Sequence, residues 1–296
     1  MLLLFMRMIR IKGLNMKKYL LLILAAITLS ACTKNAENTN LKIVTSFFPY
    51  YNMTQLLIDE TTELDNIMPL NVEVHDFEPT AKDIARLEEA DLLIVHGFDL
   101  EDWLDTVLES LNNKDLKVVY MSEGIELKES DPHTWLSPEN GKKQFTAIKD
   151  ALIALNPDSK DHYETQYETH IKEFEALIED YSVLSTYSGN SIVVDHLAYA
   201  YLLEPFNITQ RSVMSSFHSG EPSAKQIEEI IELIKNENIH SIYSTKHSET
   251  NVNDILLKET DVELLELNTL EIADTNDTYI SLMQSNLTNL IKGLSD

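Results

Sequence analysis

Three histidines, each inside a short polar signature, constrain this chain more than any other feature. His75 lies in VEVHDFEP, His133 in DPHTWLSP and His196 in IVVDHLAY, far apart in the sequence. Imidazoles so widely separated can meet only in a folded cleft. Three neutral nitrogens around one point are a donor set that a borderline-soft divalent metal prefers. The chain is therefore predicted to bind a transition metal.

The N-terminal part has the layout of a secretion signal. A basic start at Met16 is followed by the apolar run 19–29 and then by LSAC, which ends at Cys32. The LSAC pattern resembles a bacterial lipobox, so we expect residues 1–31 to be removed and Cys32 to be lipidated. The true start is expected at Met16, because a complete signal begins there. Cys32 is the only cysteine, which excludes a disulfide within the chain and a thiolate metal site.

Composition limits the partners of the chain. The formal net charge is −26, and the predicted signal contains only basic charges, so the mature chain is more acidic still. Nucleic acid is therefore excluded as an expected partner. The polar residues 32–40 are predicted to be a tether between the lipid and the folded part.

Apolar runs alternate with helical patterns along the rest of the chain, which predicts α/β architecture with parallel sheets. The expected strands are 41–46, 64–70, 91–96, 116–121, 191–195, 240–244 and 262–267. The expected helices include 80–89, with a capping box of Thr80 and Asp83, and 222–235, 252–258 and 278–292. These patterns divide the chain into an N-terminal α/β lobe over 41–157 and a C-terminal α/β lobe over 188–296.

The segment 158–187 lies between the two predicted lobes. Its apolar and aromatic residues recur mostly at helical spacings, and it contains neither Gly nor Pro. A continuous helix over this segment would be a rod of roughly 45 Å, at 1.5 Å for each residue, and would join the lobes stiffly. The alternative is an ordinary surface helix followed by a loop.

Several motifs in a fixed order resemble one family. The order is VEVHDFEPTAKDIARLEEADLLIVHG, DPHTWLSP, VVDHLAYAYL, GEPSAKQIEEIIELIKNENIHSIY and LNTLEIADTNDTYISLMQSNL. It resembles the metal-binding lipoproteins of zinc and manganese ABC importers, the cluster A-I substrate-binding proteins, and in particular their zinc type. The resemblance covers nearly the whole predicted mature chain.

This resemblance implies two α/β lobes joined by one long rigid helix, with the metal in a cleft between them. By motif it makes His75, His133, His196 and Glu271 the metal ligands. It implies a lipid-anchored monomer outside the cytoplasm that captures Zn²⁺ and delivers it to an ABC permease. Mn²⁺ is the alternative ion, although three histidines with one carboxylate favour zinc. No enzymatic activity is expected.

The chain also departs from the family pattern. Ser137 stands where the family has an aspartate, Thr269 where it often has a proline, and Ser244 with Thr245 where an acidic pair is usual. Metal-bound histidines usually donate their second N–H to an acid or a carbonyl. The candidate acids for that role lie within two residues of the three histidines: Asp76, Asp131 and Asp195.

Two other functions fit parts of the pattern. A zinc hydrolase would use three histidines and an open water position, but HExxH is absent and no general base accompanies the ligands. A surface adhesin is a third reading, which the sequence neither supports nor excludes. The remaining histidines match no motif and are expected to be surface or structural residues: His96, His162, His170, His218, His240 and His247.

Replacing Cys32 with Ser is expected to release the protein from the membrane fraction and to leave metal binding intact. The reason is that Cys32 lies in the predicted cleavage pattern and far in sequence from the predicted ligands. Cell fractionation followed by metal titration of the released protein measures both effects. A variant that stays on the membrane would point to retention by an uncleaved signal or by a partner.

Overall fold

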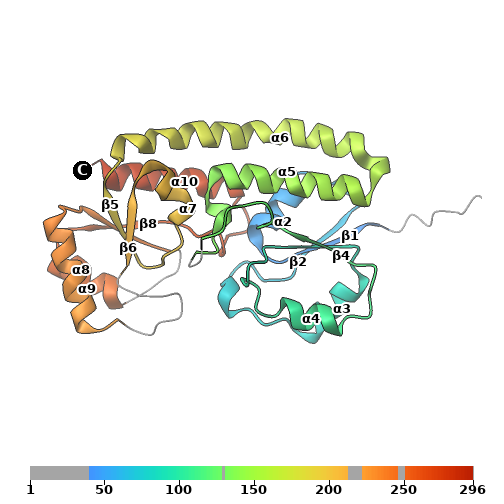
Figure 1. The fold of residues 1–296 in the computed structure, drawn as a ribbon, viewed down its shortest axis with the longest axis horizontal. Helices are drawn as coiled ribbons and strands as arrows, with labels where there is room; N and C mark the ends of the chain where they lie inside the picture. The colour runs from blue at the N-terminus through green and yellow to red at the C-terminus, as the bar shows by residue number, and fades with distance from the viewer. Residues whose placement is uncertain (1–39, 129–130, 213–221, 246–250, 296) are drawn as a thin grey trace, which may run out of the picture. The chain divides into compact units, whose positions relative to one another are not determined.

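Two parallel sheets with the same strand order organise the molecule (Figure 1). The computed structural model describes residues 40–295 except 129–130, 213–221 and 246–250. The first sheet has the order β2-β1-β3-β4 and the second the order β6-β5-β7-β8. The strands are β1 (Lys42–Thr45), β2 (Glu63–Asn66), β3 (Leu92–Val95), β4 (Lys117–Tyr120), β5 (Ser191–Val194), β6 (Thr209–Ser212), β7 (Ser241–Ser244) and β8 (Glu263–Glu266).

Helices connect and cover these strands. They are α2 (Phe48–Gln55), α3 (Ala81–Glu89), α4 (Leu104–Ser110), α5 (Pro138–Leu155), α6 (Lys160–Tyr181), α7 (Ala200–Leu203), α8 (Ala224–Asn236), α9 (Asn251–Glu259) and α10 (Tyr279–Leu294). Short 3-10 helices add η2 (Val74–Asp76), η3 (Thr134–Leu136), η4 (Pro157–Ser159), η5 (Ser182–Tyr187) and η6 (Glu204–Phe206). The mixed α/β fold with parallel sheets is as predicted.

All seven predicted strands are present, each shorter than its apolar run. The eighth, β6, was not predicted because its sequence TQRS is polar. It is an edge strand paired only with β5 among the described strands, and its side chains alternate between exposed and half-buried. Backbone pairing with β5, rather than apolar periodicity, holds it in the sheet.

The predicted helices are also present, and α3 begins with the predicted capping box. The backbone N–H of Thr80 donates to the Asp83 carboxylate at 2.7 Å, and the Asp83 N–H donates to the Thr80 hydroxyl at 3.4 Å. This satisfies two N–H groups that a helix start would otherwise leave without partners. The structure adds α2, α4, α5 and α7, which the sequence patterns did not single out.

The predicted rod is helical, but only α6 is an α-helix. Residues 182–187 continue as the 3-10 helix η5, where Thr186 donates its hydroxyl to the Val183 carbonyl at 2.8 Å. Such local side-chain bonds compete with α-helical geometry. α6 packs along α5 and also contacts α10 (Figure 1). It therefore adjoins helices from both halves of the chain.

Tyr279 lies where four helices meet. It is fully buried, its ring stacks on Phe174 of α6 at 5.4 Å, and its hydroxyl donates to the Trp135 carbonyl at 2.7 Å. Its backbone N–H donates to the Asn52 side chain of α2 at 2.8 Å. Gly141 of α5 leaves the space for the hydroxyl, since a Cβ there would lie 2.1 Å from it. The start of α10 is thus fixed to the first half of the chain.

Residues 1–39 lie outside the described residues. The signal, the tether and the lipidation of Cys32 therefore remain predictions. Within the part of the chain that the structure does describe, every helix is too short or too polar to cross a bilayer.

Replacing Tyr279 with Phe should lower the free energy of unfolding by about 1 kcal/mol, because it removes one buried neutral hydrogen bond and keeps the ring. The matched control is Tyr187→Phe, whose hydroxyl pairs with Ser295 near the surface at 2.6 Å. That change should stay within about 0.5 kcal/mol. Urea unfolding followed by fluorescence compares the two, and equal losses would contradict the role given to Tyr279.

Candidate metal centre

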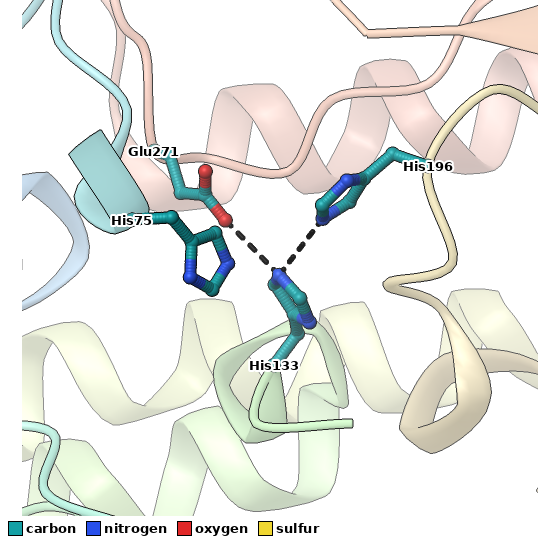
Figure 2. Close-up of side chains that lie close together, drawn as sticks. All are labelled: His75, His133, His196 and Glu271. Carbon is teal, nitrogen blue, oxygen red and sulfur yellow. Dashed lines mark hydrogen bonds and ion pairs between the residues drawn. The ribbon is translucent and has the colours of Figure 1, made fainter. Parts of the chain in front are cut away.

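Four predicted ligands come together from four separate segments (Figure 2). His75 lies in η2 after β2, and His133 directly precedes η3 in the segment after β4. His196 follows β5, and Glu271 follows β8. All four therefore lie beyond the carboxyl ends of parallel strands, where open α/β sheets bind ligands.

Their donor atoms are close enough to share one ion. One ligand atom from each residue lies within 4.8 Å of the others. His133 Nε2 is 3.1 Å from His196 Nε2 and 3.1 Å from Glu271 Oε1. Donors about 2.0–2.1 Å from a tetrahedral zinc are roughly 3.3 Å apart. Two pairs of donors therefore already have nearly the spacing of a zinc site, and the other pairs lie within 4.8 Å.

Burial differs between the four side chains. His133 is 0% exposed and Glu271 is 3% exposed, whereas His75 and His196 are half-buried. Trp135 packs under His133 with ring centroids 5.0 Å apart, and Phe47 packs against Trp135 at 4.8 Å. The inner two donors are thus shielded from water, and the other two form the more accessible side.

Two carboxylates face the buried imidazole of His133. Asp131 Oδ1 lies 2.7 Å from Nδ1, and Glu271 Oε1 lies on the Nε2 side. Burial lowers the pKa of His133, but the hydrogen bonds and charges of Asp131 and Glu271 outweigh burial and raise the pKa to about 9. At neutral pH the metal-free chain therefore carries a proton where the ion would bind.

The neighbours of His133 respond to its charge. Burial raises the pKa of Glu271, but the contact with His133 outweighs it, and the pKa is lowered overall. Burial, followed by the charge of His133, lowers the pKa of His196 to about 4. Glu271 is thus ionised and His196 neutral near pH 7, and both are in the protonation state that metal binding requires.

Of the two candidate outer acids whose side chains the structure describes, Asp131 contacts a proposed ligand. Asp131 bonds to both the ring and the backbone N–H of His133. Asp195 instead accepts from the Ser244 hydroxyl at 2.7 Å and from the Thr245 N–H at 3.1 Å, which holds the strand end before His196. The side chain of Asp76 lies outside what the structure describes.

The departures from the family pattern have structural roles. Ser137 caps α5 by accepting from the Asn140 N–H at 3.4 Å. Thr269 offers its carbonyl to the indole N–H of Trp135 at 2.8 Å. Ser244 pairs with Asp195, as described above. All three contacts are made by the residues that this chain has at these positions, without the aspartate, proline or acidic pair usual in the family.

The other described histidines lie outside the cluster. His96 is fully buried and its Nδ1 pairs with the Tyr50 hydroxyl at 2.6 Å, while burial lowers its pKa to about 3. His170 pairs with Glu173 on α6, and His240 is exposed and pairs with Asn238. His218 and His247 lie outside the described residues. The structural interpretation predicted for His96 fits its buried bond.

Two parallel sheets whose following loops bring polar donors together beyond the strand ends define a ligand-binding protein. A family model described as zinc-uptake complex component A, periplasmic, matches residues 43–293. The chain belongs to this family, as its motifs indicated.

Individual relatives agree with that assignment. The chain is 30% identical to the zinc-binding lipoprotein AdcA of Streptococcus pneumoniae, over 92% of this chain and 60% of that protein. It therefore spans only about 60% of the length of that relative. It is 28% identical to the high-affinity zinc uptake system protein ZnuA of Bacillus subtilis, over 86% of this chain and 87% of that one.

A solved structure shows the same fold. The Zn(II)-bound ZnuA-like domain of Streptococcus pneumoniae AdcA superposes with a TM-score of 0.78 at 29% identity. The match covers 87% of this chain and 100% of that domain.

The stability of the metal-free protein should fall with rising pH because of His133. Its pKa is raised from the model-compound value of 6.5 to about 9 in the folded chain. The resulting stabilisation is complete below pH 6.5 and is lost as the pH rises through 9, a change of about 3 kcal/mol. Urea unfolding between pH 6 and 9.5 with a chelator present measures it.

The matched variant is His133→Gln, which cannot titrate in this range. Its stability should change less over the same pH range, and the difference between the two curves isolates His133. Parallel curves would show that His133 is not charged in the folded metal-free protein.

Proposed function

We propose that this protein captures Zn²⁺ outside the cytoplasm and delivers it to the permease of an ABC importer. The observation that carries the proposal is the convergence of three imidazoles and one buried carboxylate on one point. The proposed ligands are His75, His133, His196 and Glu271. Membership of a family of zinc-uptake components supports the same function.

The donor set favours zinc over manganese. Three imidazole nitrogens and one carboxylate oxygen suit a tetrahedral zinc site, whereas manganese is better served by more oxygen ligands in an octahedral arrangement. Ser244 and Thr245 supply no carboxylate of their own near His196, and Asp195 is held by both of them. Manganese is therefore the alternative guest and zinc the proposed one.

The same arrangement favours holding the ion over hydrolysis. A catalytic zinc keeps one position open for water, with three protein ligands. Here Glu271 Oε1 lies 3.1 Å from His133 Nε2 and is almost completely buried, which supports Glu271 as the proposed fourth ligand. We accordingly propose a binding protein and not a zinc hydrolase.

The location and partners follow from the relatives and the N-terminal sequence. The pneumococcal relative is described as a lipoprotein, and the family as periplasmic. We propose that Cys32 carries the lipid and that residues 32–40 tether the folded part. In this proposal the lobes 41–157 and 188–296 are joined by the helical segment 158–187, and the monomer presents its ion to the permease.

Each of the substitutions His75→Ala, His133→Ala and His196→Ala should weaken Zn²⁺ binding at least about tenfold, because each removes one donor from a set of four. Calorimetry on metal-free protein measures the affinities. His240→Ala is the control, since His240 is exposed and pairs with Asn238. Unchanged affinity in any one of the three would remove that histidine from the proposed ligands.

The fourth ligand is tested in the same series with Glu271→Gln. The neutral amide keeps a weak oxygen donor, so it should cost less affinity than the loss of a histidine and should loosen selectivity among divalent ions. A zinc-bound structure with water, Asp274 or Glu266 in the fourth position would contradict the assignment. Water there would favour the hydrolase.

A further inference from the structure

The segment around His133 is hydrogen-bonded to two loops from the second half of the chain. One of these loops carries His196, and the other carries Glu271. Two of its side chains make these bonds: Asp131, two residues before His133, and Trp135, two residues after it. The three residues lie in the short DPHTW motif. One motif from the first half of the chain thus reaches two loops of the second half.

The first hydrogen bond is accepted by the carboxylate of Asp131, whose two oxygens have different partners. Its Oδ1 accepts from the ring and backbone N–H of His133 at 2.7 and 2.9 Å, and its Oδ2 accepts from the Ala200 N–H at 3.0 Å. Ala200 begins α7, only four residues after His196. The carboxylate is 4% exposed, so water competes little for either bond. Asp131 therefore links the ring of His133 to the segment of His196.

The second bond comes from the indole of Trp135. Its Nε1–H donates to the Thr269 carbonyl at 2.8 Å, and Thr269 lies two residues before Glu271. The ring is fully buried and is held edge-on by Phe47 and by His96, at centroid distances of 4.8 and 5.1 Å. A fully buried ring with two aromatic neighbours has little room to move, so Trp135 holds the Glu271 loop through the carbonyl of Thr269.

We propose that the 131–135 segment is a bracket that positions His196 and Glu271 around His133 before the ion arrives. Asp131 and Trp135 are its two positioning residues, and neither is a ligand. The inference rests on the proposed function, because it concerns the same site. It adds that three of the four donors are arranged by protein contacts alone.

The two contacts of the bracket can be weakened separately by single substitutions. In Asp131→Asn one oxygen is replaced by an amide NH₂, so a donor faces either His133 or the Ala200 N–H. In Trp135→Phe an aromatic ring remains, but the donor to Thr269 and part of the indole volume are lost. Glu204→Gln is the control, because Glu204 forms an ion pair with Lys128 between the same two segments and contacts no ligand.

The test compares hydrogen exchange of these variants in the metal-free state. Asp131→Asn should speed exchange in 196–203 and leave exchange in 267–273 as in the unaltered protein. Trp135→Phe should speed exchange in 267–273 and leave exchange in 196–203 unchanged. Zn²⁺ affinity should fall about tenfold or more for Asp131→Asn, as for other partners of metal-bound histidines. It should fall at least about fivefold for Trp135→Phe, the equivalent of one neutral hydrogen bond, because the smaller ring also leaves a cavity.

A spectroscopic readout separates positioning from a general loss of structure. Co²⁺ bound to Trp135→Phe should show weaker visible absorption than Co²⁺ bound to the unaltered protein, because water enters the tetrahedral site when Glu271 is held less firmly. Glu204→Gln should leave this spectrum and the exchange of 267–273 unchanged, and Zn²⁺ affinity within about twofold.

The proposal would be wrong if a variant raised hydrogen exchange equally in 196–203 and 267–273, or in neither of them. Should Asp131→Asn fail to fold, Trp135→Phe decides alone through 267–273 and the Co²⁺ spectrum. The exchange measurement needs no metal, so it also separates this proposal from the proposed function. Zinc binding that survives the histidine substitutions would refute the function while the exchange pattern still tests the bracket.

Discussion

The buried imidazole of His133, held between two carboxylates, is the contact on which the rest of the site depends. Asp131 and Glu271 keep a proton on this ring well above the pH at which a free histidine loses it. That proton lies where a metal ion would bind, so binding an ion and losing the proton are one event. The four side chains therefore already lie close together without metal, and charge holds His133 between its two carboxylates.

The fold brings these side chains together by using the same arrangement of parallel strands in both halves of the chain. Both sheets have the same strand order, in which the first strand of each half, β1 or β5, occupies the second position. In both sheets the proposed ligands follow the carboxyl ends of the strands. Topology of this kind creates a crevice where the connections diverge. The two halves share no sequence repeat, so the resemblance lies in the order of apolar strands and helices.

Much of this was predictable because its signals are local. Buried strands are apolar runs, the cap of α3 is written in Thr80 and Asp83, and the histidines lie in short motifs whose order resembles one family. The unpredicted parts depend on distant pairing. The polar strand β6 exists only through β5, and the bond from Trp135 to Thr269 joins residues with no shared pattern. The same holds for Asp131 and Ala200.

The charges around His133 also influence which charge the bound metal ion should carry. Without an ion, two carboxylates face one imidazolium, and the buried group keeps a surplus negative charge. A divalent ion that displaces the proton makes the group neutral, whereas a monovalent ion in its place leaves the surplus unchanged. Because net charge is costly to keep away from water, the cluster favours a divalent ion over sodium or potassium by its charge as well as by its ligand types.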